Sequence, residues 1–336
     1  MQQGWTLPVM TKKNRFALLM VASLFAVSAN GMPVAYSVNS DSGSANQDNL
    51  YRIDLETGLE EPLGELSTGS ETRDDTEGLA MDVDRNLWGI DDESRTIFRI
   101  NKSAGFVSEE ESLDSFPFIP SLGGNDFGLT FSCDNTLYAA TVQTQTLYKL
   151  DPSDGSGEIV GTIGSLGVNI SAIAANGNPN FLYAVGNGTY DNGAMDSPNL
   201  YRIDLSTGVA TVIGPLGMGT TISDYDQAGL AFDSQGVLWA ITDRRIINDQ
   251  RAANLPSEIL RINVDTGAAE VVWTTQEIGF ESLAIAPPIT CDSQKPVEEP
   301  DDDDVPHIPT LSAAGQLLAV FVLMFAGMLV LRRRIS

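Results

Sequence analysis

The stretch Leu50-Tyr51-Arg52-Ile53-Asp54 decides the fold, because the chain repeats its pattern four more times. Apolar and polar side chains alternate along it, which is typical of a β-strand with one buried face. The basic residue of the pattern recurs at intervals of 47 to 59 residues, the length of one structural repeat. The later copies are Ile97–Asn101, Leu147–Asp151, Leu200–Asp204 and Ile259–Asn263.

Three further segments complete each repeat. A glycine stands four residues after the Asp or Asn, where a short hairpin loop needs a positive φ, and a strand follows it, as in Val209–Ile213. A Leu-Trp or Leu-Tyr strand precedes each copy, as in Leu238–Ile241, and a strand of small and apolar residues precedes that, as in Gly229–Phe232. Four antiparallel strands in about 50 residues are typical of one blade of a β-propeller. The glycines are Gly58, Gly105, Gly155, Gly208 and Gly267.

The first repeat lacks its innermost strand. It begins with Val34–Val38, the counterpart of Leu238–Ile241, whereas a spare strand, Ser282–Ala286, follows the fifth repeat. We therefore predict an all-β fold over residues 34–288, a five-bladed β-propeller of four-stranded antiparallel blades. The C-terminal strand would complete the first blade and close the ring. A two-sheet β-sandwich is the alternative, but it does not explain five copies.

The repeated basic residue is interpreted as structural. Arg52 and Asp54, like Arg202 and Asp204, are two positions apart and so share one face of a strand. We expect an exposed ladder of local ion pairs, each contributing about 0–1 kcal/mol.

The composition limits the possible chemistry. The chain has 45 acidic and 19 basic residues and a net charge of −26, and a surface this acidic repels phosphate backbones, which argues against nucleic-acid binding. The single histidine, His307, lies outside the predicted propeller. This excludes Ser-His-Asp and Cys-His nucleophile systems and zinc sites with several histidines. Any catalysis would depend on carboxylates, Tyr or Lys.

Residues 1–29 have the pattern of a secretory signal peptide. The basic stretch 12–15 (KKNR) precedes the apolar run 16–27, and residues 27–29 (VSA) are small where a signal peptidase cleaves. An N-terminal membrane anchor is the alternative, although the run falls short of the ~20 residues that a spanning helix needs.

The C-terminal region has the pattern of a membrane tail. Residues 313–331 carry no charge and are long enough for a transmembrane helix, and Arg332–Arg334 follow at once. Because positive charge stays cytoplasmic, the bulk of the protein is expected on the exported side. Residues 289–307 are acidic and rich in proline, which predicts an extended, solvated spacer between the propeller and the tail.

The junction before the helix has a specific sequence. The segment Ile308-Pro309-Thr310-Leu311-Ser312, then an apolar helix and an arginine cluster, resembles the IPTL-CTERM sorting tail of Gram-negative bacteria, a relative of PEP-CTERM tails. The resemblance covers residues 308–336. It implies recognition by an exosortase-type processing enzyme, removal of the helix, and an inner-membrane intermediate that passes to the cell surface or the exterior. A plain single-pass anchor, in which the proline merely starts the helix, is the alternative.

Oxygen-bearing side chains stand just before each predicted innermost strand. In a propeller these side chains would converge near the axis at one face. They could hold a hard cation such as Ca²⁺, which takes about 6–8 oxygen ligands, or place two carboxylates across a glycosidic bond. A solvated channel mouth in an acidic protein is the alternative. The candidate residues are Glu77, Asp126, Asn169, Asp226, Gln227 and Glu281.

Two long loops, residues 186–198 and 243–256, join the second and third strands of their blades and should fall on the same side of the ring. The second loop contains Arg244, Arg245 and Arg251. These arginines could meet an acidic polysaccharide or pair with nearby acids.

Cys133 and Cys291 could form a disulfide. The expected compartment is oxidising, the count is even, and each cysteine follows an innermost strand, so both should lie on one face. Against this pairing, their blades are not neighbours, and a bridge needs Cα atoms within about 7 Å.

The turn pattern LY-x-ID-x-x-TG resembles that of secreted bacterial propellers, and quinoprotein and six-bladed lactonase-type propellers share parts of it. The single histidine and the five repeats weaken both enzyme analogies. We expect an exported cell-surface or extracellular propeller that acts as a binding or structural module, with a polysaccharide or a surface protein as partner. The alternative is a carboxylate-based polysaccharide hydrolase or lyase, with Ca²⁺ as its candidate cofactor.

Overall fold

The computed structural model of the chain describes residues 33–40, 48–113, 126–189, 198–217, 220–244 and 255–291. All of them belong to one unit, Met1–Ser293. The predicted signal peptide, most of the spacer and the whole sorting tail with its transmembrane helix lie outside the described residues. Within the described ranges, no helix is long and apolar enough to cross a membrane.

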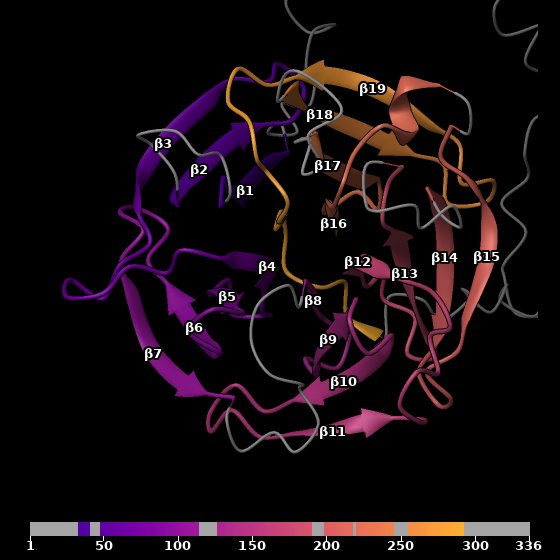
Figure 1. The fold of residues 1–336 in the computed structure, drawn as a ribbon, viewed down its shortest axis with the longest axis horizontal. Helices are drawn as coiled ribbons and strands as arrows, with labels where there is room; N and C mark the ends of the chain where they lie inside the picture. Colours follow the sequence, from indigo (N-terminus) through magenta and orange to yellow (C-terminus); the bar gives the residue numbers. More distant parts are fainter. Residues whose placement is uncertain are drawn as a thin grey trace, which may run out of the picture. The chain divides into compact units, whose positions relative to one another are not determined.

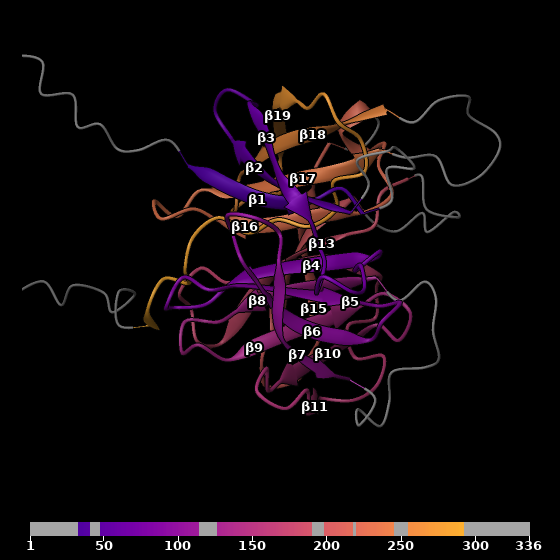
Figure 2. The ribbon, with the colours of Figure 1, turned by 90° about the vertical axis from the view of Figure 1, so that its left-hand side faces the viewer.

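Five antiparallel sheets surround a common axis (Figure 1). Figure 2 shows the same ring from the side, with the first two blades nearest the viewer. The first blade holds β1 (Val34–Val38), β2 (Asn49–Asp54) and β3 (Glu60–Glu65); the second, β4 (Thr76–Met81), β5 (Leu87–Asp91), β6 (Thr96–Ile100) and β7 (Val107–Ser112); the third, β8 (Phe127–Phe131), β9 (Leu137–Thr141), β10 (Thr146–Leu150) and β11 (Gly157–Val160); the fourth, β12 (Ile170–Ala174), β13 (Phe181–Gly186), β14 (Asn199–Asp204) and β15 (Ala210–Pro215); the fifth, β16 (Ala228–Phe232), β17 (Leu238–Arg244), β18 (Leu255–Ile262) and β19 (Ala269–Thr274). A short 3-10 helix, η2 (Thr221–Ser223), precedes β16.

The five copies of the repeated pattern lie in β2, β6, β10, β14 and β18, the third strand of each blade counted from the axis. The innermost strands consist of small and apolar residues because the axis is crowded. A Cβ on Gly128 would lie 2.8 Å from Ala172 Cα, and one on Gly229 would lie 2.4 Å from a backbone carbon of Ser282. The predicted fold class, an all-β propeller of five four-stranded antiparallel blades, is therefore confirmed.

The ring closes through the segment after β19. Tyr36 in β1 and Ala284 exchange both backbone hydrogen bonds, with N···O distances of 2.7 Å and 2.9 Å. Ser282 Oγ also accepts a hydrogen bond from Val38 N at 3.2 Å. The segment around Ala284 thus takes the innermost position of the first blade, which confirms the predicted closure, although it pairs with β1 through one bridge rather than as a regular strand.

Side chains seal the same junction between the first and fifth blades. Phe280 is fully buried and meets the ring of Tyr51 edge-on, with ring centroids 5.1 Å apart. One apolar cluster joins Ile53 of the first blade to Trp239 and Ile259 of the fifth. The closing segment is therefore held by the core as well as by its backbone.

The hairpin loop after the repeated pattern depends on two of its residues. The five predicted glycines have φ between 67° and 78°, and a Cβ on Gly105 would come 2.6 Å from a backbone oxygen of the neighbouring blade. The acid that ends the pattern holds the turn, since Asp54 Oδ1 accepts from Glu56 N and Thr57 N at 3.0 Å each. The same bonds recur at Asp204. The pattern therefore encodes both a strand and its turn.

In four blades the repeated basic residue pairs across the sheet rather than along its own strand, whereas Arg202 lies over the ring of Phe181, 4.2 Å from the ring centroid. Arg52 Nη1 lies 3.2 Å from Glu61 Oε2 in β3, and Arg99 Nη1 lies 2.8 Å from Glu109 Oε1 in β7. The expectation of Arg52 pairing with Asp54 is therefore wrong, although the exposed ladder of ion pairs is present. Directly opposite residues on antiparallel strands are closer than residues two apart on one strand, so the outermost strand supplies the partners.

Candidate functional site

The innermost strands all begin at one end of the axis, which we call the entrance end; they finish at the exit end. The residues predicted to surround the entrance end lie within, or just before, the first residues of these strands. Four are buried and two are half-buried, so they do not form an open, solvated mouth. The buried ones are Glu77, Asp226, Gln227 and Glu281, and the half-buried ones are Asp126 and Asn169.

Negative charge concentrates around Glu77. Burial is the main cause that raises the pKa of Glu77 well above its usual value, and the charges of Glu281, Asp126, Asp75 and Asp92 raise it further. Each of these influences opposes ionisation, so the site as built favours a proton or a cation beside this carboxylate.

Two of these acids, Asp75 and Asp92, were not among the predicted site residues. One carboxylate oxygen from each of Asp75, Glu77 and Asp92 lies within 4.8 Å of the others. Asp75 comes from the loop that enters β4, and Asp92 from the loop that leaves β5. Both loops lie at the entrance end, so the order of strands in a blade could have suggested them.

A β-bulge sets the position of Glu77. Thr76 pairs with Asp91 and Gly78 pairs with Ile90, so Glu77 is the extra residue of β4. A bulge changes the direction of the inserted side chain relative to a regular strand. The local geometry of this strand therefore differs from that of β8, which pairs with β9 without a register shift.

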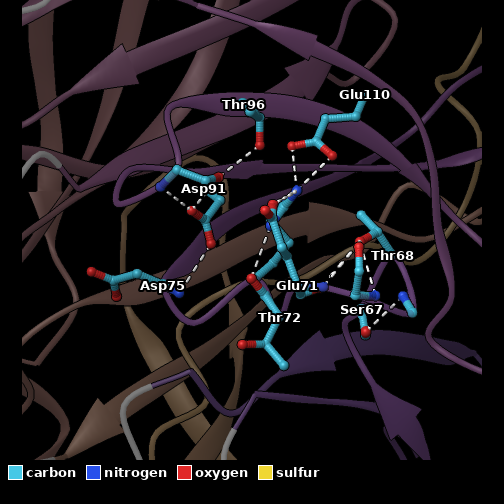
Figure 3. Close-up of polar contacts among 12 residues, drawn as sticks. Ser67, Thr68, Glu71, Thr72, Asp75, Asp91, Thr96 and Glu110 are labelled. Atoms are coloured by element: carbon cyan, nitrogen blue, oxygen red, sulfur yellow. Dashed lines mark hydrogen bonds and ion pairs between the residues drawn. The ribbon is translucent and has the colours of Figure 1, made fainter.

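Asp91 holds the two loops of the cluster together. Its Oδ2 accepts from Asp75 N at 3.0 Å, and its Oδ1 accepts from Ser94 N at 2.7 Å and from Ser94 Oγ at 2.6 Å (Figure 3). Asp92 N also donates to Asp75 O at 3.3 Å. These bonds fix the backbone on which Asp75 and Asp92 stand.

Arg73 lies two residues before Asp75, but its guanidinium forms an ion pair with Glu110. Its side chain is 4 % exposed, and its Nη2 donates to both carboxylate oxygens of Glu110 in β7, at 2.5 Å and 2.6 Å. Figure 3 shows Glu110 above the loop that carries Glu71, Thr72 and Asp75. This guanidinium therefore neutralises a carboxylate of the outermost strand.

The space beside the acidic cluster is small. A cavity of about 10 Å³ lies on the axis between the innermost strands, with Glu77 and Glu281 in its lining. That volume suits roughly one water molecule or one ion. A ligand pocket for an organic molecule is usually on the order of 300–1,000 Å³.

The other three predicted residues, Asn169, Asp226 and Gln227, make hydrogen bonds in the loops of the third to fifth blades at the entrance end. Asn169 Oδ1 accepts from Gln145 Nε2 at 2.8 Å. Asp226 N donates to Asp243 O at 2.8 Å, and Asp243 N donates to Gln227 O at 2.9 Å. The structure thus brings Glu77, Asp126 and Glu281 into one electrostatic group, while Asn169, Asp226 and Gln227 brace loops of the third to fifth blades.

The predicted arginine cluster is described only at Arg244. Its Nη1 lies 2.8 Å from Glu258 Oε1, and both side chains are 11 % exposed. Arg245 and Arg251 lie outside the described residues, as does most of the loop that holds them. Of the two interpretations given for these arginines, Arg244 fits the second, because it pairs with a nearby acid.

The exit end is closed by the chain itself. Cys133 after β8 and Cys291 after the closing segment form a disulfide with a Cα–Cα distance of 4.9 Å. Their blades are not neighbours, but the segment from Ala284 onward crosses the middle of the ring toward the third blade (Figure 1). Pro287 and Pro288 line a cavity of about 30 Å³ with apolar residues of four innermost strands. The sequence had suggested that the two cysteines lie too far apart for a bridge, but the path of the chain after the closing segment brings Cys291 to Cys133.

Among known protein families, curated proteins and solved structures, only solved structures match the chain. No protein-family model and no curated protein matches the sequence. Among solved structures, the chain is similar to virginiamycin B lyase from Staphylococcus aureus (18% identity, TM-score 0.39, covering 76% of this chain and 75% of that one) and to a gluconolactonase from Xanthomonas campestris (12% identity, TM-score 0.40, covering 68% and 70%). It also resembles a symmetrical protein from a study of evolutionary emergence (16% identity, TM-score 0.44, covering 77% and 99%). At such identity and superposition these proteins carry no argument about activity.

Proposed function

We propose that this chain is an exported β-propeller that acts as a binding module at the cell surface or outside the cell. The disulfide between Cys133 and Cys291 is the observation that carries the proposal. Structural disulfides form and persist in oxidising compartments and are rare in the cytosol. The net charge of −26 keeps such a module soluble in a saline exterior.

In this proposal, sequence patterns at the two termini direct export, membrane insertion and processing of the protein. Residues 1–29 direct export, residues 313–331 hold the protein in the inner membrane, and an exosortase-type enzyme recognises Ile308–Ser312 and removes the helix. Residues 289–307 keep the propeller away from the membrane while this happens. The support for this route is the order of these sequence patterns and the closure of the ring before the spacer begins.

Binding is favoured over a hydrolase or lyase activity by the size of the acidic site. Two carboxylates that cleave a glycosidic bond stand about 5–10 Å apart with the sugar between them. The cavity of about 10 Å³ that Glu77 and Glu281 line has no room for a sugar ring. A polysaccharide or surface protein would instead meet the loops at the entrance end.

The proposal is tested on protein purified from its native cells. We expect the intact mass to rise by two hydrogens on reduction, and peptides from residues 313–336 to be missing from the mature form. Two free thiols before reduction would contradict the exported, oxidised state. Retention of the C-terminal peptides would contradict sorting and leave a single-pass membrane protein.

A substitution separates sorting from anchoring. Replacing Pro309 and Thr310 by Ala removes the helix-interrupting residue of the recognition segment but leaves the apolar helix and its arginines intact. We expect normal insertion and accumulation of a heavier, membrane-bound form. As a control, replacing Pro300 and Asp301 by Ala in the spacer should leave processing unchanged.

A further inference from the structure

Three acidic side chains at the entrance end lie unusually close together. One carboxylate oxygen from each of Asp75, Glu77 and Asp92 is within 4.8 Å of the others. Glu77 is 5 % exposed and Asp92 is 3 % exposed, so little water separates the charges. Burial strengthens the repulsion between like charges. A positive species at the centre of the three oxygens would reverse the sign of this interaction.

A second observation marks the same place. Glu77 Oε2 is buried, and no atom of the described part of the chain makes a hydrogen bond to it. Thr76 Oγ1, from the preceding residue of the bulge, is also buried without a hydrogen-bond partner among the described residues. Buried side-chain oxygens are nearly always satisfied in native proteins, so the unsatisfied oxygen of Glu77, a member of the cluster, points to a ligand.

The chemistry of the donors selects a hard cation. The three groups that converge on this place all offer carboxylate oxygens, and the soft or borderline metals prefer nitrogen and sulfur. Calcium binds oxygens at about 2.3–2.6 Å, so two ligands on opposite sides of one ion are about 4.6–5.2 Å apart. Three carboxylate oxygens that lie within 4.8 Å of one another can share one such ion. Magnesium keeps several of its waters and usually takes one or two carboxylates, so a set of three carboxylates favours calcium.

We propose that Asp75, Glu77 and Asp92 bind a calcium ion at the entrance end of the axis. Water molecules complete the coordination, and Asp126 and Glu281 add negative charge from the third and first blades. The proposal deepens the function given above and rests on it for the metal supply, because sites of weak calcium affinity fill outside the cell. The ion joins the loop before β4, the bulge of β4 and the loop after β5.

The backbone around the cluster is built to hold these ligands in place. Asp91 fixes the amide of Asp75, and Asp92 N bonds to the Asp75 carbonyl. Ser40 Oγ lies against Glu281 and is 3.2 Å from the carbonyl oxygen of Thr76, which ties the first blade to the bulge. The acids therefore stand on ordered backbone rather than on a loose surface loop.

The experiment uses the full-length protein in detergent with Ca²⁺ alone as the probe. We expect calorimetric binding of one ion with Kd at or below about 1 mM, and a rise in Tm of about 5 °C or more at saturation. Mg²⁺ at the same concentration should give a smaller rise. No heat of binding and no rise in Tm for the wild-type protein would overturn the proposal.

Three matched variants locate the ion. Glu77→Gln keeps the shape of the side chain and should abolish the calcium-dependent rise in Tm. Asp75→Asn, at a half-buried position that tolerates change, should weaken binding at least tenfold and serves if Glu77→Gln does not fold. Glu93→Gln changes an exposed acid of the same loop and should bind like the wild type.

The outcomes separate this proposal from the one it rests on. Calcium binding that survives in both Glu77→Gln and Asp75→Asn places the ion elsewhere and overturns the site. Absence of binding, together with an oxidised and processed protein in native cells, overturns the site but leaves the exported module intact. Binding in a protein that keeps its thiols free supports the site and contradicts export.

Discussion

The two ends of the propeller axis are closed in different ways. At the exit end the chain crosses the axis, lines it with Pro287, Pro288 and apolar side chains, and is fixed by the disulfide to Cys133. At the entrance end the same innermost strands begin with buried acids around Glu77. The exit end is closed by a disulfide and apolar contacts, whereas the entrance end holds several buried carboxylates. Stability is therefore expected to reside at the exit end and along the closing segment, and ligand binding at the entrance end.

Deleting residues 280–288 should have the largest effect on stability. It removes Phe280 and the segment that pairs with β1, which exposes the edge of β1 and the apolar junction with the fifth blade. We expect loss of the cooperative thermal transition, measured by circular dichroism. A deletion of equal length in the spacer, residues 295–303, should leave the transition in place. A truncated propeller that melts like the wild type would contradict closure.

Breaking the disulfide should have the next largest effect. The bridge closes a loop with a sequence separation of 158 residues, and removing such a bridge costs about 3–5 kcal/mol of unfolding free energy. The double substitution Cys133→Ser and Cys291→Ser should lower the urea midpoint by the corresponding amount. The calcium response of the entrance end should persist in this variant. If it is lost as well, the two ends are not independent.

Glu110→Gln tests Arg73, a buried cation beside the entrance end. Arg73 is 4 % exposed and would lose the nearer of two carboxylate partners, since Glu71 Oε2 lies 3.7 Å from its Nη2. We expect a cost of about 2 kcal/mol because the neutral amide still offers one acceptor. Glu109→Gln is the matched control, since Glu109 pairs with Arg99 at an exposed site and should cost less than about 1 kcal/mol. Chemical denaturation at pH 7 measures both. Equal costs would show that burial of Arg73 has no energetic weight.

Tyr51→Phe should have the smallest effect at neutral pH. The Tyr51 hydroxyl is buried without a hydrogen-bond partner in the described part of the chain, so its removal should be neutral or stabilise by less than about 1 kcal/mol. The pKa of Tyr51 is raised to about 12, first by burial and then by the charges of Glu277 and Glu60.

The raised pKa of Tyr51 also gives a prediction at alkaline pH. An unfolded tyrosine ionises near pH 10, so the unfolded state gains stability as the pH rises from about 10 to about 12, while the folded state keeps the proton. Tyr51 should therefore contribute a loss of about 2 kcal/mol over that window, and Tyr51→Phe should lose less than the wild type by that amount. Denaturation curves at pH 10 and pH 12 test this difference. Identical losses would show that other groups dominate the alkaline transition.

The fold could be predicted from the sequence because its signals are local. Each repeat carries its strand alternation, its turn Asp or Asn and its glycine within about ten residues, as in the segment from Leu50 to Gly58. The incomplete first repeat and the spare strand at Ser282–Ala286 then indicated the closure. The partner of Arg52 could not be read in this way, because it depends on the register between β2 and β3.

The acidic cluster could be predicted only in part. Glu77, Asp126 and Glu281 follow from the rule that innermost strands begin near the axis. The order of strands could have placed Asp75 and Asp92 at the entrance end, but their approach to Glu77 depends on the bulge at Glu77 and on the bonds that Asp91 makes, which the sequence does not reveal. In a chain with 45 acidic residues, acids beside a strand are too common to single out without that geometry.

The pairing of β1 with the segment around Ala284 has a consequence for folding kinetics. Val38 and Ser282, which bond across this junction, are 244 residues apart, whereas the strands of the second to fifth blades pair within hairpins. The entropy of closing so long a loop makes this contact late, and contacts of high sequence separation slow folding. During synthesis, the first blade cannot be completed until nearly the whole propeller has emerged. The ring can therefore close only after the C-terminal part of the propeller has been synthesised and has paired with β1.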